Sequence, residues 1–148
     1  GDNTVRIGVV SATATLSLDG SDTSWAAASD ERLKTEIANS SVGLSFINAL
    51  RPVTYKWAAK NAIDEDLPFY DADSSEPCRG TEGKTHHGFI AQEVKAVIDA
   101  NSSVKDGHNI WSEDPNGTQQ LAPAALIPML VKAIQELSAE IETLKSGG

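Results

Sequence analysis

IPMLVKAIQELSAEIETLKS, residues 127 to 146, carries the clearest pattern in this sequence. Its apolar residues recur at alternating spacings of three and four, with Ile at heptad position a and Leu at position d. The seam consists of Ile127, Leu130, Ile134, Leu137, Ile141 and Leu144. This spacing predicts a long helix, over residues 124 to 145, that associates with other helices. A helix packed on its own domain has the same spacing, so both interpretations stay open.

The number of associating helices is not decided by the seam. Leu126, Val131 and Ala133 widen the apolar face at positions e and g, which favours a bundle of three or more helices. Ile at position a with Leu at position d favours dimers instead. Pro128 lies near the start of the segment and predicts an early turn or a kink there.

The other end of the chain has the composition of β-strands. Residues 1 to 28 are rich in Thr, Ser, Val and Ala, and apolar residues alternate over 5–9 and again over 16–18. The turn sequence Asp19-Gly20-Ser21 follows. Because so short a piece cannot bury its own apolar face, we interpret it as the end of a larger β structure that lies upstream.

Helical character is expected from Ser29 onward. Ser29 is a suitable N-cap, and Leu33 and Ile37 are spaced by one helical turn. A second short helix is predicted over 41–50. It should end before Arg51-Pro52, since the residue before a proline avoids helical geometry. The alternation of β-branched and aromatic residues over 53–57 then predicts a strand.

The middle of the chain predicts a surface insertion followed by ordered elements. Residues 58–86 are polar and acidic and carry few apolar residues. A short strand at 87–92 leads into a helix with Val94, Val97 and Ile98 on one face. Residues 110–113 and 119–121 flank Asp-Pro-Asn-Gly, which predicts a hairpin. The fold class is therefore predicted as α+β: an N-terminal β segment, a small mixed domain over 29–148, and a long C-terminal helix.

Composition argues against several classes of function. A net charge of −9, with 12 scattered Lys and Arg residues, argues against nucleic acid as a partner. Cys78 is the single cysteine, so an internal disulfide is impossible and folding in a reducing compartment is expected. The sequence has no apolar stretch of about 20 residues and no leader pattern, so no membrane partner is expected. His86, His87 and Cys78 lack zinc spacing, and the acidic run at 64–73 lacks the pattern of a calcium loop, so we predict no metal and no cofactor.

Three short motifs occur in an order that resembles one protein family. They are SDERLK at 29–34, HGFIAQEV at 87–94 and AALIP at 124–128, which runs into the heptad helix. The segment ALRPV at 49–53 also fits. The chain resembles the C-terminal intramolecular chaperone domain of phage endosialidase-type tailspikes and tail fibres, which are self-cleaving peptidases with a Ser/Lys dyad. The resemblance covers residues 29–148, interrupted by the insertion at 58–86.

The resemblance implies a function and a cellular setting. It implies a coiled-coil-like homotrimer that directs the folding of its own upstream fibre shaft, to which residues 1–28 would belong. The precursor would fold in the host cytoplasm, the chaperone domain would be released by autoproteolysis, and the shaft would stay in the virion. The alternative is a module of the same fold that does not cleave and remains as a permanent trimerisation clamp.

The resemblance also implies a catalytic site. Ser29 corresponds to the nucleophile, Lys34 to its base, and His87 to a histidine that orients the site or carries protons. The bond that breaks joins Ala28 to Ser29. Residues expected to organise the site are Asp30, Arg32 and Gln92.

Alternative pairings and routes remain open. Lys34 would simply pair with Asp30 if the two lay one helical turn apart, and Arg32 could equally pair with Glu36. Cleavage would proceed either by an N-to-O acyl shift onto Ser29 followed by ester hydrolysis, or by direct attack of water.

Overall fold

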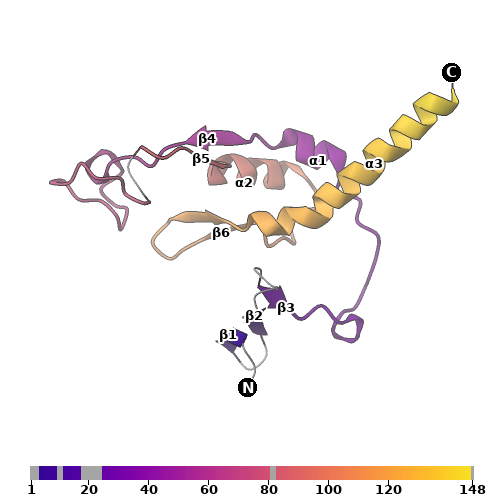
Figure 1. Cartoon of the computed structure of the whole chain (residues 1–148), viewed down its shortest axis with the longest axis horizontal. Helices are drawn as coiled ribbons and strands as arrows, with labels where there is room; N and C mark the ends of the chain where they lie inside the picture. The colour runs from indigo at the N-terminus through magenta and orange to yellow at the C-terminus, as the bar shows by residue number, and fades with distance from the viewer. Residues whose placement is uncertain (1–3, 10–11, 18–24, 81–82, 148) are drawn as a thin grey trace. The chain divides into compact units, whose positions relative to one another are not determined.

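A computed structural model describes residues 4–9, 12–17, 25–80 and 83–147 of the 148-residue chain. The chain divides into two compact units, Gly1–Asn39 and Ser40–Gly148. The described elements are short antiparallel strands and helices, of which the longest helix is C-terminal (Figure 1). The predicted α+β class is confirmed.

The first unit contains a three-stranded antiparallel sheet. Its strands are β1 (Thr4–Val9), β2 (Ala12–Ser17) and β3 (Ala26–Ala27), in the order β1-β2-β3. Val5 lies opposite Leu16 in this register. Ile7 is 63 % exposed, so the sheet leaves apolar surface uncovered by this chain. The strands predicted near both alternating stretches are confirmed, while the turn predicted at 19–21 lies outside the described residues.

The helix predicted from Ser29 is wrong. The chain forms only a 3₁₀ turn, η1 (Glu31–Leu33), and Asp30 rather than Ser29 caps it by accepting a hydrogen bond from a backbone N–H. Leu33 and Ile37 are 72 % and 65 % exposed. Because a short helix is marginal in water without an apolar face to bury, these two residues cannot stabilise it within this chain.

The second unit contains the elements that the sequence predicts, within a few residues at their ends. Its two short helices are α1 (Leu44–Ala49) and α2 (Ala91–Ala100). Two antiparallel pairs join β4 (Val53–Tyr55) to β5 (His86–Gly88) and β6 (Trp111–Glu113) to β7 (Gln119–Leu121). The turn η3 (Pro123–Leu126) leads into α3 (Ile127–Ser146), so Pro128 lies in the first turn of the helix.

The core of this unit lies between α1, α2, the β6–β7 hairpin and the start of α3. Its most deeply buried side chains include Phe46 from α1, Ile98 from α2 and Ile110 just before β6. Val94 and Ile98 belong to the apolar face that the sequence predicts for α2. The turn of the β6–β7 hairpin depends on Gly117, whose φ of 80° lies in the left-handed region that glycine tolerates.

The predicted insertion at 58–86 is a loop closed at its base. Ala59 forms an antiparallel bridge with Pro77, and the backbone N–H of Cys78 donates to the carbonyl of Ala58. Within the loop, the Arg79 guanidinium lies 4.1 Å from the ring centre of Phe69. The last residue of the predicted insertion, His86, instead begins β5, because pairing with Tyr55 continues the β4–β5 ladder.

One side of α3 packs against its own unit. Ala133 is buried there, as is Leu126 just before the helix, and the Glu136 carboxylate accepts a hydrogen bond from the Leu44 N–H at 2.7 Å. That N–H is at the start of α1, where helix N–H groups lack partners within the helix. The hydrogen bond and the ion pair of Glu136 with Lys132 hold the pKa of this carboxyl below its ordinary value.

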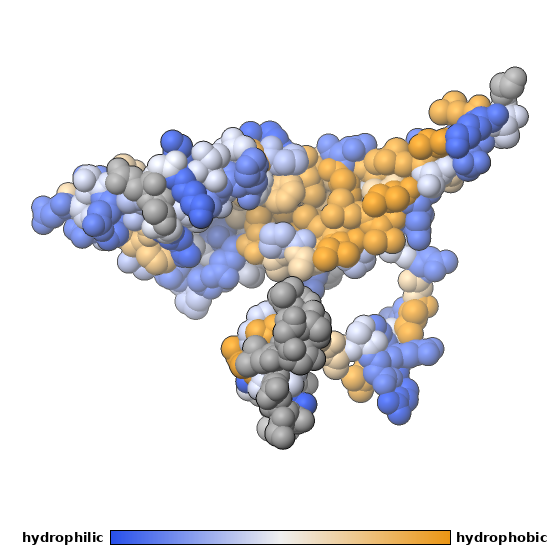
Figure 2. Space-filling view, viewed as in Figure 1, coloured by the Kyte–Doolittle hydropathy of each residue, from blue (hydrophilic) through white to orange (hydrophobic). Residues whose placement is uncertain are grey.

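The heptad seam lies on the side of α3 that its own unit leaves free. The six seam residues are 42 to 78 % exposed, and apolar surface follows the helix in Figure 2. The seam therefore does not pack on its own unit. The argument for three or more helices also loses two of its residues, because Leu126 and Ala133 are already buried within the chain and only Val131 still widens the free face.

Candidate functional site

Ser29 and Lys34 are in direct contact. The Lys34 Nζ lies 2.7 Å from the Ser29 Oγ, and the 3₁₀ turn η1 between them folds the chain back to make the contact. Both residues are exposed in this chain. A protonated Lys34 donates to the hydroxyl across this distance, whereas a neutral Lys34 accepts the hydroxyl proton. The same contact therefore serves a general base once the lysine loses its proton.

Asp30 and Arg32 form a closed pair beside this contact. The guanidinium donates from Nε to Asp30 Oδ1 at 2.9 Å and from Nη2 to Oδ2 at 2.7 Å. The backbone N–H of Arg32 also donates to Oδ1. The side-chain bonds, followed by the backbone bond, lower the pKa of Asp30. The side-chain bonds also raise the pKa of Arg32. In the described part of the chain, neither Lys34 with Asp30 nor Arg32 with Glu36 forms an ion pair.

His87 and Gln92 belong to the second unit. His87 is the central residue of β5, opposite Thr54, and its side chain is exposed. Gln92 is the second residue of α2 and is also exposed, so it lies in the helix rather than in the predicted strand. The structure describes each unit by itself, and the participation of these two residues in chemistry at Ser29 remains a prediction.

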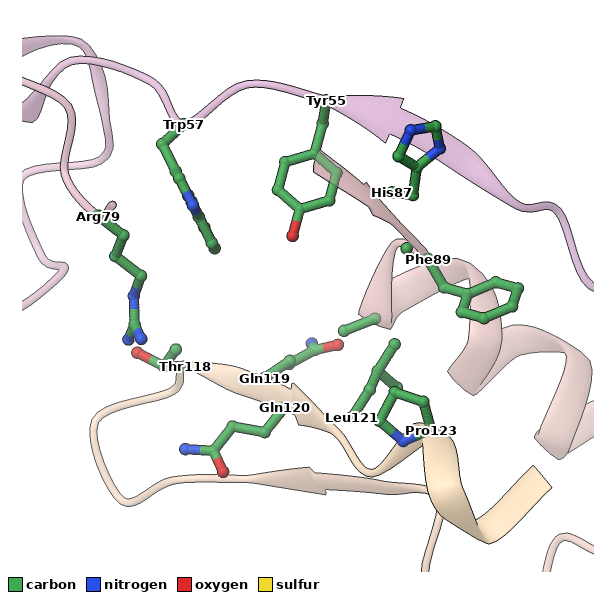
Figure 3. A pocket seen from close by; sticks show the side chains of 12 residues that line it. Tyr55, Trp57, Arg79, His87, Phe89, Thr118, Gln119, Gln120, Leu121 and Pro123 are labelled. Atoms are coloured by element: carbon green, nitrogen blue, oxygen red, sulfur yellow. The ribbon is translucent and has the colours of Figure 1, made fainter. Parts of the chain in front are cut away.

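His87 lines a groove of about 600 Å³ between the β4–β5 pair and the β6–β7 hairpin. Figure 3 shows Tyr55 and Trp57 on one wall, with Gln119 and Leu121 on the facing hairpin. Local sequence patterns do not reveal this groove, because its walls come from segments that are far apart in the chain. The only sequence signal was the alternation that places two aromatic residues on the same side of one strand.

The neighbouring histidine has a different environment. His86 is half-buried and stacks on Tyr55, with ring centres 5.5 Å apart. Its Nε2 is buried and has no hydrogen-bond partner among the described residues. His86 thus contributes to an aromatic cluster with Tyr55 and Trp57, while His87 presents its imidazole to solvent.

A second arginine–carboxylate ion pair involves Glu93, which follows Gln92 in the motif at 87–94. Arg51, which follows α1, forms a two-pronged ion pair with Glu93 in the first turn of α2, with Nε 2.9 Å from Oε2. Hydrogen bonding to Arg51 lowers the pKa of Glu93. The pair connects two motifs that are far apart in the sequence, which is why pattern analysis could not assign it.

A comparison with protein families locates this site within a known domain. The family model described as chaperone of endosialidase, a peptidase family, matches residues 29–102, which is half of the chain. The chain belongs to this family. The matched region of this chaperone begins at Ser29 and includes Lys34, His87 and Gln92. Membership supports a chaperone role and a relationship to self-cleaving serine peptidases.

The remaining comparisons add no further relationship. Neither the curated proteins nor the solved structures contain a match. Among the described residues, no three His, Cys, Asp or Glu side chains are grouped so that they could hold a metal ion. No helix in the described ranges is both long and apolar enough to cross a membrane.

Proposed function

We propose that this chain is a trimerising intramolecular chaperone that directs the folding of an upstream fibre shaft and then cuts its own Ala28–Ser29 bond. The observation that carries the proposal is the 2.7 Å contact between Ser29 Oγ and Lys34 Nζ at the first residue of the family match. The nucleophile and the base of a Ser/Lys dyad require this proximity.

The proposed chemistry is an N-to-O acyl shift. Neutral Lys34 takes the hydroxyl proton of Ser29 as Oγ attacks the carbonyl carbon of Ala28. The C–N bond then breaks, and the protonated Lys34 returns the proton to the departing amino group, leaving an ester between Ala28 and the Ser29 side chain. Water hydrolyses this ester, which yields the Ala28 carboxylate and a domain whose new N-terminus is Ser29. His87 would orient the site, as the family resemblance implies.

Assembly supplies what the isolated chain lacks. A lysine acts as a base near neutral pH only when desolvation or nearby positive charge lowers its pKa. Ser29 and Lys34 are exposed in this chain, and so is the apolar seam of α3. Association along the seam would bring three sites together and withdraw them from water, so that cleavage follows assembly. The number three comes from the family resemblance, since the seam by itself is equally suited to a dimer.

A detachable trimer clamp suits an intertwined shaft. Pairing strands from three chains requires closure of long loops before any contact forms, which is slow and costly. A trimer tethered at Ser29 raises the local concentration of the strands and sets their register. Removing the clamp afterwards eliminates the easy route back, so the shaft becomes kinetically stable.

The second candidate is a permanent clamp that never cleaves. The exposure of Ser29 and Lys34 favours it, because a lysine base near neutral pH depends on desolvation that an exposed site lacks. This candidate has the same α3 interface and the same homotrimer, and it differs only in leaving the Ala28–Ser29 bond intact.

Intact mass measurement and N-terminal sequencing of the freshly expressed full chain distinguish the two candidates. Native protein should yield a domain that begins at Ser29, and hydroxylamine should accelerate its release because it cleaves the ester. Ser29→Ala should give an uncleaved trimer. Lys34→Arg should also stay uncleaved, since arginine keeps its proton. The matched control Lys105→Arg changes an exposed lysine elsewhere and should be processed normally.

Other results would decide against the proposed mechanism. A new N-terminus at any residue other than Ser29, or normal processing of Lys34→Arg, would overturn the dyad. A native chain that stays uncut as an assembled trimer would identify the permanent clamp.

A further inference from the structure

Lys34 lies among acidic residues, each of which is a possible ion-pair partner for its ammonium. Asp30, Glu31 and Glu36 all lie within four residues of it, and Arg32 is the other cation of the segment. Asp30 directly follows Ser29, and consecutive Cα atoms are only about 3.8 Å apart. Its carboxylate is therefore the one nearest in sequence to the hydroxyl that Lys34 contacts.

Both oxygens of the Asp30 carboxylate accept hydrogen bonds from Arg32. Its guanidinium donates to both oxygens, Oδ1 and Oδ2, and its backbone N–H donates a further hydrogen bond to Oδ1. Among the described residues, Lys34 forms no ion pair with any carboxylate, and its Nζ contact is with Ser29. Of the two cations, Arg32 thus pairs with the Asp30 carboxylate and Lys34 contacts the Ser29 hydroxyl.

We propose that Arg32 is a positioning residue that withholds the Asp30 carboxylate from Lys34 and thereby leaves Lys34 available as the base for Ser29. This inference rests on the proposed self-cleavage. An arginine suits the task because its planar fork covers both carboxylate oxygens at once, which an ammonium cannot do. Asp30 in turn caps η1, so the same pair also holds the turn that brings Ser29 and Lys34 together.

The inference predicts how two variants change the pH dependence of cleavage. Arg32→Gln frees Asp30 to pair with Lys34 and removes a positive neighbour, and both effects favour the protonated lysine. The inflection of the rate against pH should move upward by about one unit, with cleavage slowed about tenfold below it. Adding Asp30→Asn removes the freed charge while keeping an N-cap residue, and should return the inflection toward the native value. Glu31 and Glu36, the other charges beside Lys34, are the same in all three proteins.

The test uses the full chain and separates chemistry from folding. Each protein is assembled at about pH 5, where a lysine is protonated, and is then transferred to a series of higher pH values. The appearance of the domain beginning at Ser29 is followed by mass spectrometry. Native mass spectrometry before the transfer establishes that each variant is assembled.

The outcomes separate this inference from the proposed function. An upward shift in Arg32→Gln that the second substitution reverses supports the inference. An unshifted inflection, or equal slowing at every pH that Asp30→Asn does not reverse, overturns it and assigns Arg32 a purely structural role. If the native chain does not cleave at all, the proposed function itself fails.

Discussion

Ile134→Ala tests whether the free side of α3 is an association surface. Ile134 is at the centre of the seam and is 64 % exposed, so it contributes little to packing within its own chain. Alanine has a higher helix propensity than isoleucine. The substitution should therefore leave the fold of the single chain intact and weaken only the contacts that other copies make with the seam.

The expected loss of association free energy follows from the exposed fraction of the Ile134 side chain. Truncation removes three carbon atoms, each contributing about 0.8 kcal/mol when it is buried from water. Scaled by the 64 % that is exposed, complete burial in the assembly would contribute about 1.5 kcal/mol per protomer. Three protomers lose about 4–5 kcal/mol together, which lowers the association constant of the trimer about a thousandfold.

Sedimentation equilibrium over a range of protein concentrations measures this change. Gln135→Ala is the matched control, since it alters the adjacent exposed residue outside the seam and should leave association unchanged. Circular dichroism of both variants should report the helix content of the native chain. Equal association of Ile134→Ala and Gln135→Ala, or a native chain that stays monomeric at micromolar concentration, would refute the reasoning.

Further predictions concern the core, the α1–α3 junction and surface charge. Ile98→Ala should lower the free energy of unfolding of the second unit by about 2–5 kcal/mol in chemical denaturation, because Ile98 is completely buried. Gly43→Ala would bring a Cβ within 2.5 Å of Glu136 Oε2 and displace the carboxylate from Leu44, so amide hydrogen exchange should quicken at Leu44 in α1. The pKa of Glu136 is lowered in the folded chain, so the ionised carboxylate contributes stability that is fully present above the ordinary pKa of 4.5 and is lost as pH falls through the folded pKa. Glu136→Gln should therefore reduce the loss of stability during acid titration. With a net charge of −9 on each chain, the three chains of a trimer repel one another, and salt screens this repulsion. Sedimentation should therefore report tighter association as the salt concentration rises.

Most of the second unit could be predicted from local patterns. The proline after Arg51 ends α1, the alternation around Tyr55 gives β4, and the Asp-Pro-Asn-Gly turn gives the β6–β7 hairpin. Each of these signals acts over a few residues, where backbone geometry and side-chain periodicity decide the outcome. The helix expected from Ser29 does not form, because its apolar residues Leu33 and Ile37 are exposed and so do not stabilise it by burial.

The candidate site, too, could be predicted from the sequence only in part. The motif SDERLK indicated Ser29 and Lys34 as partners, and the turn η1 between them produces the contact. The distribution of the charges was not predictable, because the helical spacing that would pair Lys34 with Asp30 assumed a helix that does not form. Arg32 takes Asp30 instead, through an arrangement of three hydrogen bonds that depends on the actual course of the turn.

The sequence by itself determined the heptad seam, the family motifs and the order of the elements, since each depends on the spacing of neighbouring residues. Tertiary structure alone decided which side of α3 is buried. Leu126, Ala133 and Glu136 face α1 and the core, which leaves the seam outward. Periodicity finds the apolar positions of a helix but not the surface that covers them, because that surface is contributed by residues more than eighty positions away along the chain.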